Sequence, residues 1–196
     1  MSEMTDAGSP ASDRVQVRFA GFGGQGIILA GSILGQAAVV HSGHNAVMSE
    51  DYGPESRGGS CTAEIVIADS EIDYPRVTRP DVLVLMSQQA YDKYAPGRPA
   101  GSVLIVDEDL VDLGSAPPAD VLRAPATRIA EELGRRIVAN IVMLGFLAGA
   151  TGIVDIEMLR RAVAAAVPRG SEPLNLAAVN RGYEHARAIA GGAQRR

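Results

Sequence analysis

Three glycines near the start of the chain have the spacing of a phosphate-binding loop. The stretch AGFGGQGIIL follows a run of β-forming residues, Val15 to Ala20, and places Gly21, Gly23 and Gly26 in the pattern G-x-G-x-x-G. In that pattern the glycines permit a tight turn, a close backbone approach and close packing of the next helix on the strand. The N–H groups that open the helix can bind an anion. The loop is compatible with a dinucleotide site, with a site for another phosphate or anion, and with a turn that binds nothing.

An acidic residue at the end of the second strand would favour the dinucleotide site. Such a residue usually follows the glycines by roughly 20 positions and binds the ribose. Glu50 and Asp51 lie near that place, although a little late, and they open another loop. A free-standing NAD(P)-binding oxidoreductase that uses the glycines and Glu50 therefore remains an alternative at this point.

The second stretch with chemical potential is EDYGPESRGGSC. Its Tyr52-Gly53-Pro54 sequence predicts a turn, Glu55 and Arg57 bring opposite charges close together, and Gly58 and Gly59 leave the backbone unshielded. At the carboxyl end of a strand, such a loop lies where open α/β sheets bind ligands. There Arg57 could bind a carboxylate or phosphate with its fork of donors. The alternative is a surface turn with a local Glu55–Arg57 pair, which would contribute little to stability.

Strands and helices that alternate along the chain must position these loops. The apolar patterns predict a Rossmann-like, mainly parallel sheet with helices on both faces, followed by a helical C-terminal third. Ser87 and Asp155 are the expected helix caps. The predicted strands cover residues 15–20, 45–50, 62–69, 81–87 and 101–107, with a short edge strand within 120–125.

Composition excludes several classes of protein. The single cysteine, Cys61, rules out a disulfide framework and an iron–sulfur cluster held by four cysteines of this chain. The three histidines have no metal-binding spacing, so we expect no metal site. The net charge of −5, without a basic cluster, argues against nucleic-acid binding.

The polar stretch at residues 1–14 is typical of a disordered leader, and residues 15–196 are expected to form a single domain. The leader lacks the basic and apolar regions of a signal peptide. No apolar run is long and uninterrupted enough to span a bilayer. The expected location is therefore the cytoplasm.

Taken together, several stretches resemble the gamma subunits of 2-oxoacid:acceptor oxidoreductases, which include 2-oxoacid:ferredoxin oxidoreductases. The stretches are GFGGQGI, DYGPESRGGSCTAEI, EIDYPRVTRPDVLVLMSQQAYDKY, NIVMLGFLAG and NLAAVNRGYEHA. They cover nearly the whole chain beyond residue 14 and are far more specific than the glycine pattern alone. The forms YGPESRGG and SQQAYDKY are most similar to the 2-oxoglutarate type or the aryl-oxoacid (phenylglyoxylate) type.

The resemblance implies oxidative decarboxylation of a 2-oxo acid with coenzyme A, giving acyl-CoA and carbon dioxide. In this family thiamine diphosphate, with magnesium, lies on alpha and beta subunits, and iron–sulfur clusters lie on beta or delta-type subunits. Electrons pass to ferredoxin or an NAD-linked acceptor. The gamma domain packs on the catalytic subunits and helps to form the coenzyme A side of the active site. We therefore expect no catalytic residue on this chain.

Two sets of residues match the family's motifs. The first set is expected to offer backbone donors to a phosphate or a subunit, and consists of Gly21, Gly23, Gly24, Gln25 and Gly26. The second set is expected to form the loop facing coenzyme A or a subunit interface, and consists of Tyr52, Gly53, Pro54, Glu55, Arg57, Gly58 and Gly59. A scaffold with neither loop near the active site is the competing hypothesis. Cys61 is expected to be buried and not nucleophilic, and Asn140 to join its helix to a loop.

Overall fold

A six-stranded sheet organises the protein, which we describe from a computed structural model that covers residues 14–53, 59–115 and 118–193. The strands, in sheet order, are β2 (Asn45–Tyr52), β3 (Ser60–Ala68), β1 (Arg14–Phe22), β4 (Val82–Leu85), β5 (Val103–Asp107) and β6 (Val121–Ala124). β1, β4, β5 and β6 pair in parallel, whereas β3 runs antiparallel to both β1 and β2. The predicted mainly parallel sheet is confirmed, with β3 as the exception.

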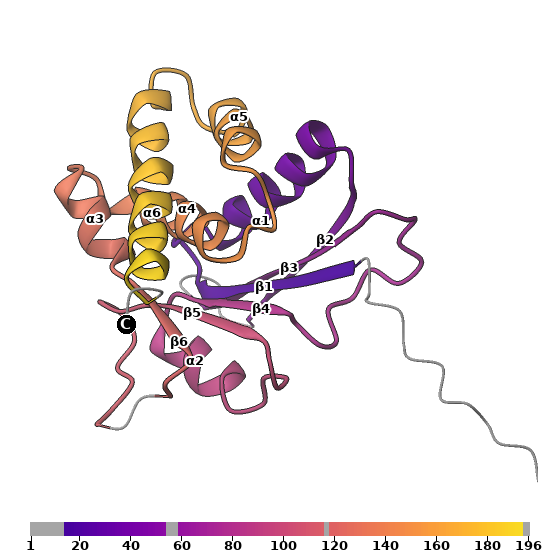
Figure 1. Ribbon diagram of the computed structural model, residues 1–196, viewed down its shortest axis with the longest axis horizontal. Coiled ribbons are helices and arrows are strands. Elements are labelled where there is room, and N and C mark those ends of the chain that lie inside the picture. Colours follow the sequence, from indigo (N-terminus) through magenta and orange to yellow (C-terminus); the bar gives the residue numbers. More distant parts are fainter. Residues whose placement is uncertain (1–13, 54–58, 116–117, 194–196) are drawn as a thin grey trace, which may run out of the picture.

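Helices cover the two faces of this sheet unequally (Figure 1). One face carries α1, α3, α4, α5 and α6 over a large apolar core, in which Val17 and Phe19 of β1 are fully buried. The other face carries α2 over a smaller core that includes Ala20. The helices are α1 (Ile27–Gln36), α2 (Gln88–Tyr94), α3 (Ala126–Glu132), α4 (Ala139–Thr151), α5 (Ile156–Ala166) and α6 (Glu172–Ala193), with a π-helical turn at Ala37–His41 and a 3₁₀ turn at Arg136–Val138.

The helical C-terminal third is confirmed, and glycines explain how closely its helices pack. A Cβ atom on Gly145 of α4 would overlap the carbonyl oxygen of Val179 in α6, and one on Gly182 would overlap that of Val142. The backbones of α4 and α6 can therefore approach each other closely. This packing fixes the start of α4 above the sheet.

β1 extends further than the sequence predicts. It begins at Arg14, which the sequence predicts to be part of the leader, and continues beyond Ala20 to Phe22. The antiparallel partner β3 explains the extension, because Gly21 and Phe22 pair with Cys61 and Ser60. The two predicted helix caps are confirmed: Ser87 accepts a hydrogen bond from the N–H of Ala90, and Asp155 caps α5.

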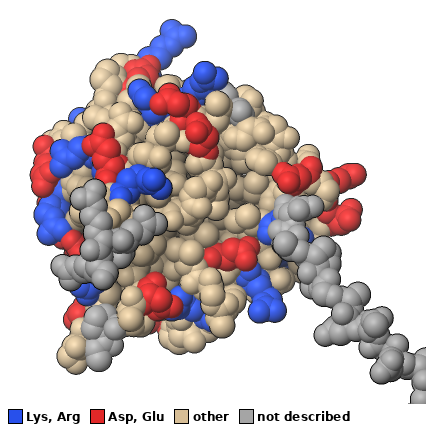
Figure 2. Space-filling model, viewed as in Figure 1, with Lys and Arg blue, Asp and Glu red and all other residues tan. Residues whose placement is uncertain are grey.

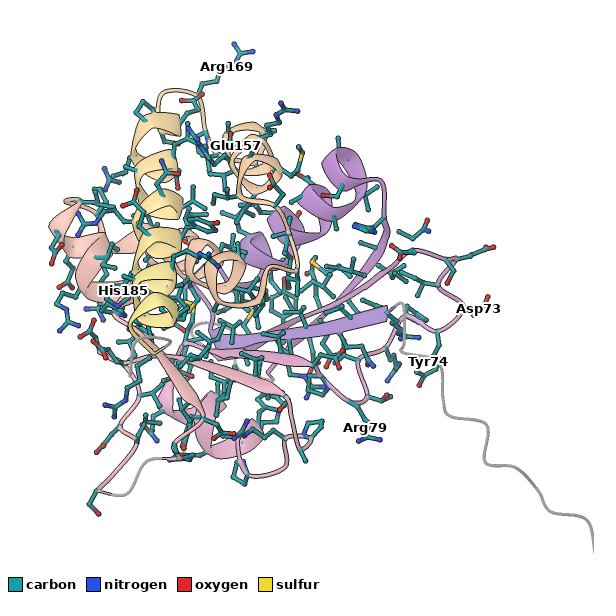
Figure 3. The ribbon with its side chains drawn as sticks, in the orientation of Figure 1. Asp73, Tyr74, Arg79, Glu157, Arg169 and His185 are labelled. Carbon is teal, nitrogen blue, oxygen red and sulfur yellow. The ribbon has the colours of Figure 1, made fainter. Side chains whose placement is uncertain are left out.

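At the amino ends of the strands, the segment 69–81 is bound to the sheet by side chains of β1. Gln16 accepts a hydrogen bond from the N–H of Thr78 at 2.9 Å. Arg18 donates to the carbonyl of Val77 and forms an ion pair with Glu64 at 2.5 Å. Figure 3 labels Tyr74, whose carbonyl oxygen accepts a bond from Arg14 and which lies far from the helical layer.

Charged side chains lie around the margins of the molecule in this view. Figure 2 shows an uncharged central area with acidic and basic groups gathered around it. One segment of the sequence carries no charged residue at all. No Lys, Arg, Asp or Glu occurs from Ile27 to His41, which covers α1 and the π-helical turn that follows it. No helix of the described residues is long and apolar enough to cross a membrane.

Candidate functional site

The two predicted loops adjoin at the carboxyl end of β1. The N–H of Gly23 donates to the carbonyl oxygen of Gly59 at 2.8 Å, and that of Gly53 donates to the carbonyl of Ser60 at 2.7 Å. The structure thus brings the glycine loop beside the Gly59 end of the second loop, and the Gly53 end is bonded to Ser60 of β3. Tyr52, Gly53 and Gly59 of this loop are described. Its central residues lie outside the described part of the chain; these are Pro54, Glu55, Arg57 and Gly58, together with Ser56.

The side chain of Gln25 holds the glycine loop in place. Its Oε1 accepts a hydrogen bond from the N–H of Phe22 at 2.6 Å, and its Nε2 donates to the carbonyl of Met86 at 2.7 Å. A Cβ on Gly21 would overlap this Oε1, which explains the glycine there. Gln25 therefore joins the ends of β1 and β4 with its side chain.

This geometry departs from a dinucleotide site. Gly21 lies in a strand paired with β3, and the N–H of Gly23 is already bonded to the second loop. Glu50 and Asp51 lie on β2, which β3 separates from β1. Because neighbouring strands are about 4.8 Å apart, β2 lies on the order of 10 Å from β1, whereas the acidic residue of a dinucleotide site ends the strand next to β1. The free-standing NAD(P) alternative finds no support in this arrangement.

A pocket of about 360 Å³ opens at the carboxyl edge of the sheet; we call it the edge pocket. Residues that follow β1, β4, β5 and β6 line it, which is where ligands bind in open α/β sheets. Arg136 lines the pocket, and its exposed side chain forms a 3.7 Å ion pair with Glu131. The lining residues are Gly24, Gln25, Met86, Leu110, Thr127, Arg136, Ile137 and Ala139.

A buried carboxylate fixes one wall of the edge pocket. Asp107, at the end of β5, is fully buried and accepts hydrogen bonds from the hydroxyl of Thr127 at 2.7 Å and from its N–H at 3.2 Å. It thereby caps α3, whose own N-cap residue is Pro125. Burial raises the pKa of the Asp107 carboxyl, although the bonds from Thr127 oppose that shift.

A second pocket, of about 380 Å³, lies between the amino ends of α1, α4 and α6; we call it the helix pocket. Asn140 lines it and donates from Nδ2 to the carbonyl of Gly26 at 3.1 Å. The predicted helix-to-loop bond of Asn140 is therefore confirmed. The lining residues are Gly24, Gly26, Leu29, Arg135, Ile137, Val138, Asn140, Ile141, Val167, Pro168, Ser171, Leu174 and Asn175.

Cys61 is buried, as expected, with an exposed fraction of 4%. Burial raises the pKa of its thiol, and the nearby carboxylates of Glu50 and Asp51 raise it further. A nucleophilic cysteine requires the opposite shift. Tyr52 is exposed, and its hydroxyl donates to Glu50 at 2.7 Å, which raises the pKa of the phenol.

Sequence analysis missed Arg136, Thr127 and Asn175 as pocket residues. Asp107 carried a usable signal, because it ends a buried strand and so lies at the ligand-binding edge of a parallel sheet. Among the residues that the structure describes, no group of three His, Cys, Asp or Glu side chains could hold a metal ion.

Comparison with known proteins shows the family to which the chain belongs. Residues 16–185 match the model of the family described as pyruvate ferredoxin/flavodoxin oxidoreductase. The chain belongs to this family. It is a gamma-type subunit of the 2-oxoacid oxidoreductases, like the solved gamma subunit that it matches over most of its length.

Three of these similarities bear on function. The chain is 51% identical to 2-oxoglutarate synthase subunit KorC of Methanocaldococcus jannaschii, over 90% of this chain and 96% of the relative. It is similar to the gamma subunit of a keto/oxoacid ferredoxin oxidoreductase from Geobacter sulfurreducens PCA, with 41% identity, a TM-score of 0.78 and coverage of 89% and 97%. It is 36% identical to ketoisovalerate oxidoreductase subunit VorA of Methanothermobacter marburgensis, over 79% of this chain but only 32% of that longer protein.

Proposed function

We propose that this gamma subunit serves an enzyme that oxidatively decarboxylates 2-oxoglutarate with coenzyme A, and that its carboxyl edge contacts the coenzyme. The identity of 51% to a 2-oxoglutarate synthase subunit, against 36% to a ketoisovalerate oxidoreductase subunit, supports the substrate. An aryl-oxo acid is the other substrate to test.

The observation that carries the coenzyme contact is the edge pocket with Arg136 beside it. The pocket is open, lies at the ligand-binding edge and borders the glycine loop through Gly24 and Gln25. A guanidinium at such a place pairs well with phosphate. The neighbouring second loop carries Arg57, which would add another cation.

The chemistry of the reaction belongs to other subunits in this proposal. Among the described residues, no group of three His, Cys, Asp or Glu side chains could hold a metal ion. We place thiamine diphosphate, its magnesium and the iron–sulfur clusters on alpha, beta or delta-type subunits, with ferredoxin or an NAD-linked acceptor taking the electrons. In this proposal, the present chain binds and orients coenzyme A and helps to enclose it.

Two arginine variants of the assembled enzyme test the proposal. Arg136→Ala and Arg57→Ala each remove a cation, and we expect each to raise the KM for coenzyme A by about tenfold. The kcat and the KM for 2-oxoglutarate should stay within about twofold, because the chemistry lies elsewhere. Arg79→Ala is the matched control, since Arg79 is exposed at the opposite end of the sheet (Figure 3).

An unchanged KM for coenzyme A in both variants, with the complex intact, would favour the scaffold hypothesis. If phenylglyoxylate turns over efficiently and 2-oxoglutarate does not, the proposed substrate is wrong.

A further inference from the structure

Two asparagines that line the helix pocket have side-chain oxygens that accept no hydrogen bond from the described residues. Asn140 and Asn175 are buried, with exposed fractions of 3% and 7%, and both line the pocket. Each side-chain amide donates once, Asn140 to Gly26 and Asn175 to the carbonyl of Ser171 at 2.9 Å. Neither Oδ1 receives a hydrogen bond from the described residues. Neither oxygen is sealed from solvent in the isolated chain. An occupant that displaces this solvent should therefore bring N–H or O–H groups.

The start of α1 borders the same pocket and presents hydrogen-bond donors to it, where the asparagine oxygens are acceptors. Its N-cap residue is Gly26, and no side chain caps the helix. The first N–H groups of a helix have no partner within the helix. An occupant that offers both N–H and C=O groups, as a peptide does, would satisfy the asparagine oxygens and these amides together.

The rest of the lining is apolar, and this character continues onto the exposed surface. Leu174 and Val167 line the pocket, while Leu29 and Ile137 at its border are 39% and 68% exposed. Arg135 also lines the pocket and disfavours a cationic occupant. These features fit a neutral segment with an apolar side chain.

We propose that the helix pocket receives a neutral peptide segment, led by an apolar side chain, from a larger subunit of the same enzyme. Two observations select a protein partner. The apolar surface extends beyond the pocket, along a helix without charged residues. In addition, VorA carries this region within a chain of which it is only 32%, so the region there is covalently joined to further protein. The proposal rests on the proposed function, because it requires the multi-subunit enzyme.

Leu29→Asp tests the docking directly. Leu29 lines the helix pocket and not the edge pocket, and it lies in the first turn of α1, where the helix dipole favours a carboxylate. The variant should therefore fold normally. The control is Ile189→Asp, which places the same charge at a position of similar exposure on α6. The measurement is the Kd between the separately purified, fluorescently labelled chain and the larger subunits.

We expect Leu29→Asp to weaken this association by about 30-fold or more, and Ile189→Asp to change it by less than about threefold. Asn175→Leu, checked for an unchanged melting temperature, should weaken the association by about tenfold, because this variant leaves the partner's donor unpaired.

An unchanged Kd for Leu29→Asp overturns the docking proposal and leaves the proposed function standing. A raised KM for coenzyme A with an unchanged Kd would also overturn it, because the coenzyme would then occupy the pocket. If the unmodified chain does not bind the larger subunits at all, both proposals fail.

Discussion

At the amino ends of the strands, Gln16 and Arg18 of β1 find partners within the chain, whereas beyond the carboxyl ends two buried asparagines have amide oxygens that accept no hydrogen bond from the described residues. Gln16 and Arg18 bind the segment 69–81, and Arg18 is also paired with Glu64. At the other end, the amide oxygens of Asn140 and Asn175 face a pocket with no donor from the described chain.

The difference distinguishes polar groups that contribute to stability from polar groups that can bind another molecule. Polar groups that are satisfied internally hold the sheet and its adjoining segment together. Acceptors that face a pocket without a donor are available to another molecule, and an occupant that displaces water from them must donate in its place. Substitutions at the amino end should therefore change stability alone, whereas those at the carboxyl end can also change assembly or coenzyme binding.

The largest expected effect comes from Gly26→Ala at the carboxyl end. Gly26 has a φ of +72°, and a Cβ there would overlap Nδ2 of Asn140. The strained backbone and the displaced asparagine should together lower the free energy of unfolding by about 3 kcal/mol. Gly24→Ala is the control, because Gly24 also has a positive φ but its Cβ would meet nothing within 4 Å. Urea denaturation should give a loss of about 1 kcal/mol for that control; equal losses for the two variants would contradict the account.

Arg18→Met at the amino end should lower the free energy of unfolding by about 2 kcal/mol. The change leaves the carboxylate of Glu64, which is 21% exposed, without its partner, and removes a cation–π contact with Tyr94 at 4.9 Å. Denaturation of the isolated chain measures the loss. The KM for coenzyme A in the assembled enzyme should not change, and a tenfold rise would show that the two ends are not separate in function.

The smallest effect is a pH dependence that Asp107 should produce. Because burial raises the pKa of this carboxyl, the folded state holds the proton more tightly than the unfolded state does. The resulting stabilisation is complete below the unfolded pKa of about 3.9 and is lost as the pH rises through the folded pKa. The free energy of unfolding of the unmodified chain, minus that of Asp107→Asn, should therefore fall as the pH rises above about 4. A difference that rises with pH over this range would contradict the pKa direction.

Features encoded locally were predictable from the sequence. Ser87 and Asp155 follow capping rules that depend on a few neighbouring residues, and both predictions are confirmed. The buried strands were recognisable from short apolar runs. The contact between Asn140 and the glycine loop was predictable in kind, because a buried amide within an apolar helix requires a partner.

Features that depend on distant residues were not predictable. Hydrophobic periodicity does not encode strand direction, so nothing indicated that β3 runs antiparallel and extends β1 to Phe22. The bond from Gln25 to Met86 joins residues 61 positions apart. Asn175 became part of a pocket only through the packing of α6 beside α4. The role of Arg57 remains a prediction, because it lies outside the described residues.

Purification of the native protein through a tag on this chain tests the central claim most directly. The account predicts that larger subunits co-purify in fixed stoichiometry, with thiamine diphosphate and iron–sulfur absorbance. The preparation should reduce an electron acceptor only when both 2-oxoglutarate and coenzyme A are present. A chain that emerges alone and binds NAD would contradict the account, and the glycine loop would then be a dinucleotide site after all.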